Sequence, residues 1–308
     1  MKAAIWTFRT IHRNTVSPST NIAIWLAKQT GLPLCWDEKI LESDLDILLI
    51  VNGSFTFSKG LPVVAKAVLR AKRIIWLQND YAIVPPKPVS TGMSPFRKAF
   101  RVRRKRGLPD IEYWTTVAPN AALPGGRYFN WNAFFYAPPD KRELRAKGGS
   151  DLFYYGYFRR LRQKALEYYL KDAPYPVTIS SGSKEFLTYG VEVVPRMLDL
   201  RSDLRQHGLG LYVEDTRSHK EFHSPATRFY EMLGASLPIA FQPEAKKMLR
   251  RAGFDVRDFV ARNAADIRYM LRHRTDIRQA QYELWCEKDY GRELRYDVRK
   301  ALHSEGLL

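Results

Sequence analysis

The chain is poor in cysteine, poor in acidic residues and without a long apolar run, and each shortage excludes a class of protein. Only Cys35 and Cys286 occur among 308 residues, which excludes a disulfide framework and a four-cysteine zinc site. The longest apolar runs, such as Ile47–Val51, are as short as a strand, whereas a membrane helix needs about 20 apolar residues. The first residues lack the apolar stretch and the cleavage site of a signal peptide. We therefore expect a soluble protein of a reducing compartment that has no membrane partner.

Three familiar catalytic motifs are also missing. No Gly-Lys-Ser/Thr triplet, no Gly-x-Ser-x-Gly and no His-Glu-x-x-His occurs in the chain. A Walker phosphate loop, a serine hydrolase with a nucleophile elbow and a zinc protease of that kind are therefore not expected.

What the chain has in excess is positive charge. Lysine and arginine number 50 against 32 acidic residues, so the formal net charge is +18. A disordered polycation is excluded, because 45% of the residues are hydrophobic and 13% are aromatic, enough for a sizeable core. A strongly basic folded chain is typical of a protein that binds nucleic acid or an anionic surface.

One segment, 97–106, carries seven basic residues and no acidic one. Prolines and glycines flank it on both sides, so we expect a loop or short helix that projects between ordered elements. Phosphate groups would be its natural ligands, although a solvated basic face or a localisation signal would have the same composition. Its basic residues are Arg97, Lys98, Arg101, Arg103, Arg104, Lys105 and Arg106.

Strand and helix patterns alternate in both halves of the chain, which predicts parallel sheets covered by helices on both faces. A charged, glycine-rich stretch at 141–150 separates the halves, so we expect domains at 1–145 and 146–285. Ligands of such folds bind outside the carboxyl ends of the strands. The expected strands are 2–7, 34–36, 47–51, 73–78, 152–155, 177–181, 210–213 and 237–241, and the expected helices are 21–29, 61–71, 163–171 and 225–234, with a helical tail from 264.

Three strand ends carry side chains that suit catalysis or ligand binding. The first of these side chains is the carboxylate of Asp80, which follows the strand 73–78. A carboxylate there is well placed as a general base for an acceptor hydroxyl. An aspartate that caps the following turn would look the same, and the position alone favours neither interpretation.

The second is the stretch 155–162, after the first strand of the second half. Gly156 lets the backbone approach a ligand closely, and Arg159 and Arg162 next to a helix N-terminus suit a pyrophosphate. A surface arginine cluster is the alternative interpretation.

The third is the helix that carries Arg228 and Glu231, three residues apart on one face. The carboxylate could hold the hydroxyls of a ribose while the arginine faces phosphate. A surface ion pair within an ordinary helix is the alternative. The helix is followed by a Gly-x-x-x-Pro turn into a strand, a spacing that resembles the one used by nucleotide-sugar transferases.

Taken in order, these stretches resemble the two-Rossmann-domain (GT-B) glycosyltransferases, and most closely the DNA β-glucosyltransferases of T-even bacteriophages. The individual motifs are moderately specific, and their collinear order over most of the chain carries the resemblance. The similar segments are 15–21 (TVSPSTN), 45–60 (LDILLIVNGSFTFSKG), 76–86 (WLQNDYAIVPP), 151–163 (DLFYYGYFRRLRQ) and 228–241 (RFYEMLGASLPIAF).

The resemblance implies a GT-B fold, α/β with two Rossmann-like domains facing a cleft, and a C-terminal helix, 286–308, that packs back towards the N-terminal domain. It also implies roles for individual residues. Asp80 takes the place of the catalytic base. The expected donor-binding residues are Val16, Ser17, Asn21, Arg159, Arg162, Val194, Arg228 and Glu231, and the expected DNA contacts are Asn52 and Ser54. The charge of the basic segment, and not the resemblance, adds Arg97, Arg101, Arg103, Arg104 and Arg106 to the expected DNA contacts, as a clamp.

The sequence departs from the family in three places, one of which is the basic segment 97–106, for which the family has no counterpart. The second loop arginine of the family falls on Gln163, with Arg162 adjacent, and the acidic residue near the sugar falls on Asn21. The identity of the transferred sugar therefore stays open.

The implied activity is inverting transfer of a sugar from a UDP-sugar to the hydroxyl of a 5-hydroxymethylpyrimidine, with 5-hydroxymethylcytosine as the expected base, in flipped-out duplex DNA. We expect a monomer in the cytoplasm of a phage-infected bacterium. Two alternatives stay open: a GT-B transferase with a cell-envelope or other glycan acceptor, and a non-catalytic DNA-binding protein on a relic transferase fold.

One polar patch has ligand types that suit a metal. It comprises Glu214, Asp215, His219 and His223, which could instead contact a diphosphate or DNA. We assign no metal site, although the resemblance leaves room for a loosely held Mg²⁺ or Mn²⁺ near the diphosphate.

Overall fold

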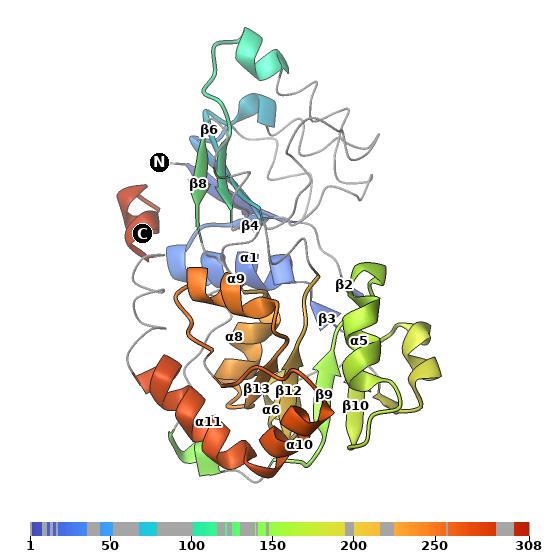
Figure 1. Ribbon diagram of the computed structural model, residues 1–308. Coiled ribbons are helices and arrows are strands. Elements are labelled where there is room, and N and C mark those ends of the chain that lie inside the picture. Colours follow the sequence, from blue (N-terminus) through green and yellow to red (C-terminus); the bar gives the residue numbers. More distant parts are fainter. Residues whose placement is uncertain are drawn as a thin grey trace. The chain divides into compact units, whose positions relative to one another are not determined.

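The computed structural model divides into two compact units, each with its own parallel sheet (Figure 1). One comprises Met1–Trp131 together with Asp297–Leu308, and the other comprises Asn132–Tyr296. The division thus falls after residue 131, whereas the sequence suggested residue 145. The structure describes residues 2–7, 11–12, 15–16, 18–35, 44–51, 68–78, 101–115, 121, 125–129, 139, 141–145, 148–194, 200–215, 225–256, 258–287 and 299–307.

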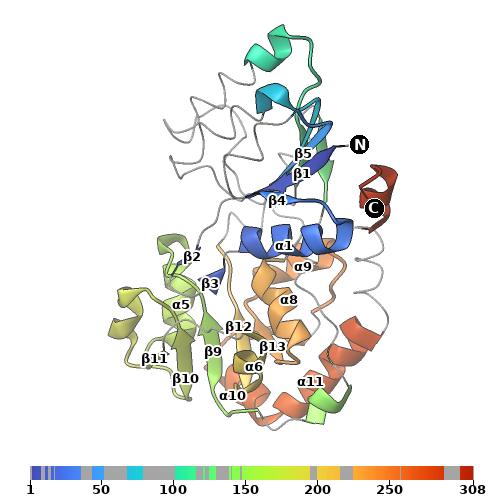
Figure 2. The ribbon, with the colours of Figure 1, turned by 180° about the vertical axis from the view of Figure 1, so that it is seen from behind.

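The sheet of the first unit has six parallel strands in the order β4-β1-β5-β6-β7-β8, and Figure 2 labels three of them, β4, β1 and β5. The runs ILLIV and RIIWLQ form its central strands, because a parallel strand covered on both faces selects continuous apolar side chains. The four strands expected here are confirmed. The strands are β1 (Ala3–Trp6), β4 (Leu34–Cys35), β5 (Ile47–Val51), β6 (Arg73–Gln78), β7 (Glu112–Thr115) and β8 (Gly126–Tyr128).

The first helix, α1 (Pro18–Thr30), begins earlier than the expected residue 21. Proline is favoured at the first position of a helix, because no intrahelical partner exists there for the N–H that it lacks. Just before α1, β2 (Ile11–His12) and β3 (Thr15–Val16) form an antiparallel pair. Of the helix expected at 61–71, residues 68–70 are described and helical.

The end of the chain returns to the first unit, as the resemblance implied. Residues 299–304 are helical, and Leu302 and Leu307 are buried. Glu305 forms ion pairs with Arg73 on β6, at 2.5 Å, and with Arg127 on β8, at 3.3 Å. Two strands of the sheet are thereby tied to the last residues of the chain.

The basic segment is helical over residues 101–105. Arg103 is only 2% exposed. Its guanidinium donates to the carbonyl oxygens of Lys72 at 2.5 Å, Val68 at 2.9 Å and Pro109 at 2.8 Å, and also to that of Ala71. Three of these carbonyls belong to the short helical turn and the residues that lead into β6. Because this guanidinium is buried and bonds four backbone carbonyls, it is not available to a DNA phosphate, which contradicts the expectation that Arg103 contacts DNA.

The neighbours of Arg103 remain accessible. Arg101, Arg104 and Arg106 are exposed, and the ion pair of Arg104 with Asp110, at 2.9 Å, leaves its side chain 75% exposed. Three of the expected DNA contacts therefore stay predictions, and Arg97 lies outside the described residues.

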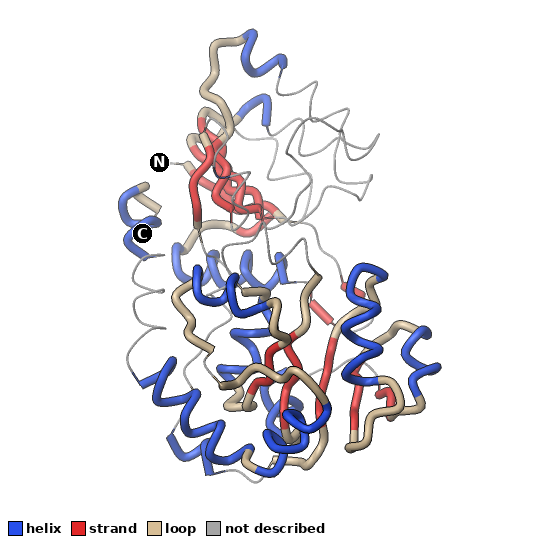
Figure 3. Tube along the Cα trace, in the orientation of Figure 1, coloured by secondary structure: helices blue, strands red, loops and turns tan. Residues whose placement is uncertain are grey.

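The sheet of the second unit has five parallel strands in the order β11-β10-β9-β12-β13, drawn in red in Figure 3. In chain order this is 3-2-1-4-5, which matches the first five positions of the Rossmann order 3-2-1-4-5-6, and the order in which the strands are added reverses between β9 and β12. The four strands expected here are confirmed, and β11 is additional. The strands are β9 (Leu152–Tyr155), β10 (Val177–Ser180), β11 (Glu192–Val194), β12 (Leu209–Tyr212) and β13 (Ile239–Phe241).

Helices of the second unit bury their apolar faces around this sheet. No helix in the described ranges is long and apolar enough to span a membrane. The helices are α5 (Gln163–Leu170), α6 (Leu200–Arg205), α8 (Thr227–Gly234), α9 (Ala245–Arg251), α10 (Ala264–Arg272) and α11 (Arg274–Tyr282), with short turns η4 (Lys141–Arg145), η5 (Arg160–Arg162) and η6 (Lys184–Tyr189) and a π-helix, η7 (Glu283–Glu287).

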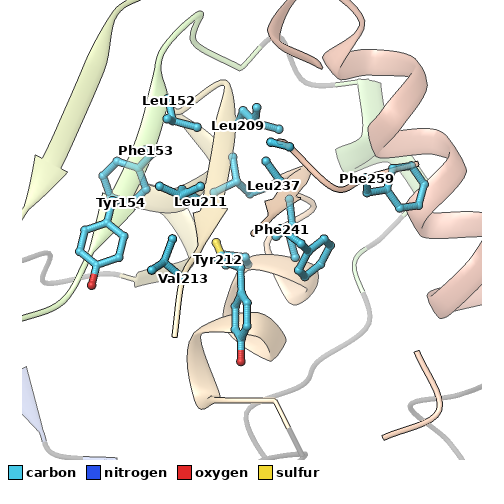
Figure 4. Packing of buried hydrophobic residues seen from close by; sticks show 14 of the residues in the cluster. Leu152, Phe153, Tyr154, Leu209, Leu211, Tyr212, Val213, Leu237, Phe241 and Phe259 are labelled. Carbon is cyan, nitrogen blue, oxygen red and sulfur yellow. The ribbon is translucent and has the colours of Figure 1, made fainter. Parts of the chain in front are cut away.

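The core of the second unit fixes α8 against β12 and β13. Tyr212 packs against Phe241 in this core, with ring centroids 5.7 Å apart, and Figure 4 shows both among the buried residues of the sheet. The approach is close: a Cβ at Gly210 on β12 would lie 2.4 Å from Met232 Sδ on α8. Packing thus sets the position of α8, and with it the position of the polar residues in its first turn, such as Arg228.

The turn η4 explains why the boundary falls before residue 145. Its Glu143 forms an ion pair with Arg205 on α6, at 2.5 Å, and Leu144 accepts a hydrogen bond from Arg278 on α11, at 3.3 Å. These contacts place η4 in the second unit.

We predict that Arg103→Met lowers the free energy of unfolding by about 2–5 kcal/mol, because four carbonyls would lose a charged donor. Urea unfolding followed by tryptophan fluorescence measures this change. Arg101→Met, an exposed position in the same helix, should change stability by about 0.5 kcal/mol or less. Equal effects of the two substitutions would contradict the structural role of Arg103.

Candidate functional site

The carboxyl ends of β9 and β12 lie side by side where the strand order reverses, the usual binding position in such sheets. β9 ends at Tyr155 and continues into Gly156, whose φ of +137° is a conformation that favours glycine. A Cβ at Gly156 would lie 3.6 Å from Arg228 Nη1. The glycine thus lets the chain turn beside a guanidinium.

Arg162 is the buried arginine of the loop after β9. The 3₁₀ turn η5 ends at this residue, and α5 follows directly. Its side chain is 7% exposed and forms an ion pair with Glu214, while its Nε lies 3.8 Å from Asp215 Oδ2. Both acids follow β12, so this arginine joins the ends of the two central strands.

Arg228, in the first turn of α8, reaches the same carboxylate. Its Nη2 donates to Glu214 Oε1 at 2.8 Å, and its Nη1 donates to the backbone oxygen of Tyr155 at 3.3 Å. The guanidinium lies over the ring of Tyr154, 5.4 Å from its centroid. Burial alone would lower the pKa of Arg228, but the Glu214 carboxylate acts together with Tyr154 and Tyr212 to raise it, and the net pKa lies above the usual value.

Glu231, one turn further along α8, accepts a 2.6 Å hydrogen bond from Tyr155 Oη. Burial, together with the nearby carboxylate, raises the pKa of Tyr155 well above its usual value. The hydroxyl therefore stays protonated and remains a donor to Glu231. The guanidinium of Arg228 pairs with Glu214 in the loop after β12 and its side chain is only 11% exposed, so Arg228 is not a surface residue.

Arg159 differs from the other two arginines. It is exposed just before η5, and its side chain has no hydrogen bond or ion pair to the described residues. The loop around it is held by its backbone, since Gly156 N donates to Ser180 O at 3.2 Å and Phe158 N donates to Ser183 Oγ at 2.9 Å. Arg159 is thus a cation on an anchored loop.

Of the expected donor-binding residues, the structure brings together Arg162, Arg228 and Glu231. Val194 lies at the carboxyl end of β11, two strands away from β9. Val16 is in β3 and Asn21 in α1. The expected residues that lie outside the described ranges are Ser17, Asn52, Ser54, Asp80 and Arg97.

The described side chains suit an anion better than a metal ion. No group of three or more histidine, cysteine, aspartate or glutamate side chains gathers within the described ranges. Both carboxylate oxygens of Glu214 contact arginines. His219 and His223 lie outside the described residues, and a divalent ion held mainly by a diphosphate stays a prediction.

Sequence reasoning missed two residues of the site. Glu214 was noted as a possible metal ligand or diphosphate contact and not as the partner of two arginines, and Tyr155 was given no role. An acidic residue directly after a buried strand, with arginines after the neighbouring strand, was the pattern that could have found Glu214, because parallel strands place these positions at one edge.

No protein-family model and no curated protein matches this sequence. Several solved structures, in contrast, have a similar fold. A T4 phage β-glucosyltransferase bound to UDP and Mn²⁺ has a TM-score of 0.69 at 16% identity, over 98% of this chain and 99% of that one. The chain has the fold of the GT-B glycosyltransferases.

Two further structures extend the comparison. The DNA-modifying enzyme β-glucosyltransferase, studied with and without uridine diphosphoglucose, has a TM-score of 0.64 at 16% identity, over 100% of this chain and 97% of that one. An α-glucosyltransferase in complex with UDP and a 13-mer DNA has a TM-score of 0.60 at 10% identity, over 97% of this chain and 99% of that one. The likeness spans both units of the chain.

Proposed function

We propose that this GT-B protein transfers a sugar from a UDP-sugar to the hydroxyl of a 5-hydroxymethylpyrimidine in double-stranded DNA, with 5-hydroxymethylcytosine as the expected acceptor base. It would act as a monomer in the cytoplasm of a phage-infected bacterium. The structures of similar fold include enzymes bound to UDP and to DNA.

The observation that carries the proposal is the convergence of Arg162, Arg228 and Glu231 beyond the ends of β9 and β12. Two guanidinium groups supply donors for a diphosphate, and a carboxylate one helical turn away suits ribose hydroxyls. The net charge of +18 favours a polyanionic acceptor.

The proposed chemistry is a direct displacement. Asp80 takes the proton of the acceptor hydroxyl as its oxygen attacks the anomeric carbon, which inverts that centre. The bond to the diphosphate breaks, and Arg159, Arg162 and Arg228 stabilise the negative charge that develops on the leaving group. The acceptor base leaves the helical stack so that its hydroxyl can reach the donor.

Transfer of label from radioactive UDP-sugars tests the function. The acceptors compared are hydroxymethylated duplex DNA, unmodified DNA and an extract of envelope lipids and glycans. Label on hydroxymethylated DNA alone supports the proposal. Label on the envelope extract would favour the glycan-acceptor alternative, and DNA binding without transfer of any sugar would favour a relic fold.

Glu231→Ala should weaken UDP binding by about 1–3 kcal/mol, because a ribose hydroxyl would lose its carboxylate acceptor. Calorimetry on the folded variant measures the change. The wild type should prefer UDP over 2′-deoxy-UDP, and the variant should lose this preference. An unchanged preference would remove Glu231 from the ribose site.

Asp80→Asn should bind DNA and UDP-sugar nearly as well as the wild type and turn over at least about a hundredfold more slowly, because the amide lacks the basicity of the carboxylate. Steady-state transfer to hydroxymethylated DNA measures the rate. If Asp80 only caps a turn, asparagine replaces it with little effect, so near-normal turnover would refute its role as the base.

Replacing Arg101, Arg104 and Arg106 together with glutamine should lower DNA affinity. The slope of log affinity against log salt should flatten by up to about 0.9 for each DNA phosphate that the variant no longer neutralises. The matched control replaces Lys246, Lys247 and Arg250, three exposed cations of α9, which removes the same charge from the other unit. Equal slopes in the two triple variants would mean that the 101–106 segment does not bind DNA specifically.

A further inference from the structure

Glu214 occupies the centre of the site, between two arginines that come from different elements. Its side chain is 3% exposed, against 7% for Arg162 and 11% for Arg228. One carboxylate oxygen faces each guanidinium. Its backbone is also fixed, because Glu214 N donates to Gln242 Oε1 at 2.9 Å.

The two guanidinium groups have further partners that define their orientation. Arg228 bonds the backbone oxygen of Tyr155 and lies over the ring of Tyr154, and Arg162 Nε lies 3.8 Å from Asp215. A guanidinium has five N–H donors. Since a single carboxylate accepts from one nitrogen of each arginine, both arginines keep donors that it does not use.

We infer that Glu214 is a positioning residue that holds Arg162 and Arg228 as a pair, so that their remaining donors bind the diphosphate of the donor substrate together. The inference rests on the proposed UDP-sugar site and adds to it a residue that touches no substrate atom. A preorganised pair of donors binds an anion without first having to order two long side chains.

Positioning and simple charge predict opposite effects of the same substitution. Glu214→Gln removes a negative charge next to the anion site, so Coulomb attraction alone would make a diphosphate bind more tightly. A glutamine oxygen can still accept from one guanidinium, but its amide nitrogen cannot accept from the other. If Glu214 acts by positioning, UDP therefore binds more weakly in spite of the charge gained.

The experiment is calorimetric titration of the full-length protein with UDP and with uridine. The variants are Glu214→Gln and Glu214→Asp, and the latter keeps the charge but draws the carboxylate back by one methylene group from the two arginines. Glu143→Gln is the matched control, since it breaks an ion pair with Arg205 in the same unit. We expect about tenfold weaker UDP binding in both Glu214 variants, with uridine binding unchanged and normal binding of both ligands in the control.

Two other binding results would overturn the inference. UDP that binds Glu214→Gln as tightly as the wild type, or more tightly, would show that charge and not position matters. Equal weakening of UDP and uridine would indicate a general structural role. If Glu214→Gln does not fold, the same comparison is made with Glu214→Asp alone. A wild-type protein that binds no UDP would instead overturn the proposed donor, and with it the role of Glu214.

Discussion

A guanidinium group taken out of water needs acceptors for its N–H groups, either an anion or several carbonyl oxygens, because it cannot lose its proton to become neutral. The second unit places Arg162 and Arg228 in this situation, and Glu214 provides the anion for both. The strand β12, which ends just before Glu214, the loop after β9 and the first turn of α8 are therefore tied to one carboxylate. The geometry of the candidate site follows from this neutralisation.

The parallel sheet makes such a cluster possible from residues far apart in the sequence. Carboxyl ends of parallel strands lie at one edge, so the loop after β9 and the residues after β12 become neighbours. Packing of α8 on β12, close enough that Gly210 has no room for a side chain, brings Arg228 and Glu231 to the same edge. Apolar packing thus positions the polar groups.

Much of the fold could be predicted from the sequence because its central strands are continuous apolar runs. The peripheral strands β7 and β8 were missed because their segments, EYWT and GRY, are short and partly polar. Only the last two residues of β7 are buried, and two of the three residues of β8 are exposed, so periodicity does not distinguish these segments from loops. The start of α1 was misplaced because local spacing ignores the preference of proline for a first turn.

The candidate site was predictable in its residue types and not in its pairings. Arg228 and Glu231 were recognised as neighbours on one helix face, but Glu214, the partner of Arg228, lies in the loop after β12, which no local spacing reveals. Arg103 shows the converse. A run of basic residues suggests a solvated or DNA-facing surface, and only tertiary structure distinguishes the one arginine of the helix that turns inward to bond backbone carbonyls. Asp80 stays a prediction.

The return of residues 299–307 to the first unit has a consequence for the order of events during translation. The second unit, Asn132–Tyr296, is one uninterrupted stretch. The sheet of the first unit precedes this stretch, yet the carboxylate of Glu305 and the side chains of Leu302 and Leu307, which complete that unit, are synthesised after the whole of the second unit. Domains generally fold as units while the chain emerges. The first unit is therefore begun before the second one and completed after it, so apolar surface that Leu302 and Leu307 cover stays exposed while the second unit is being made.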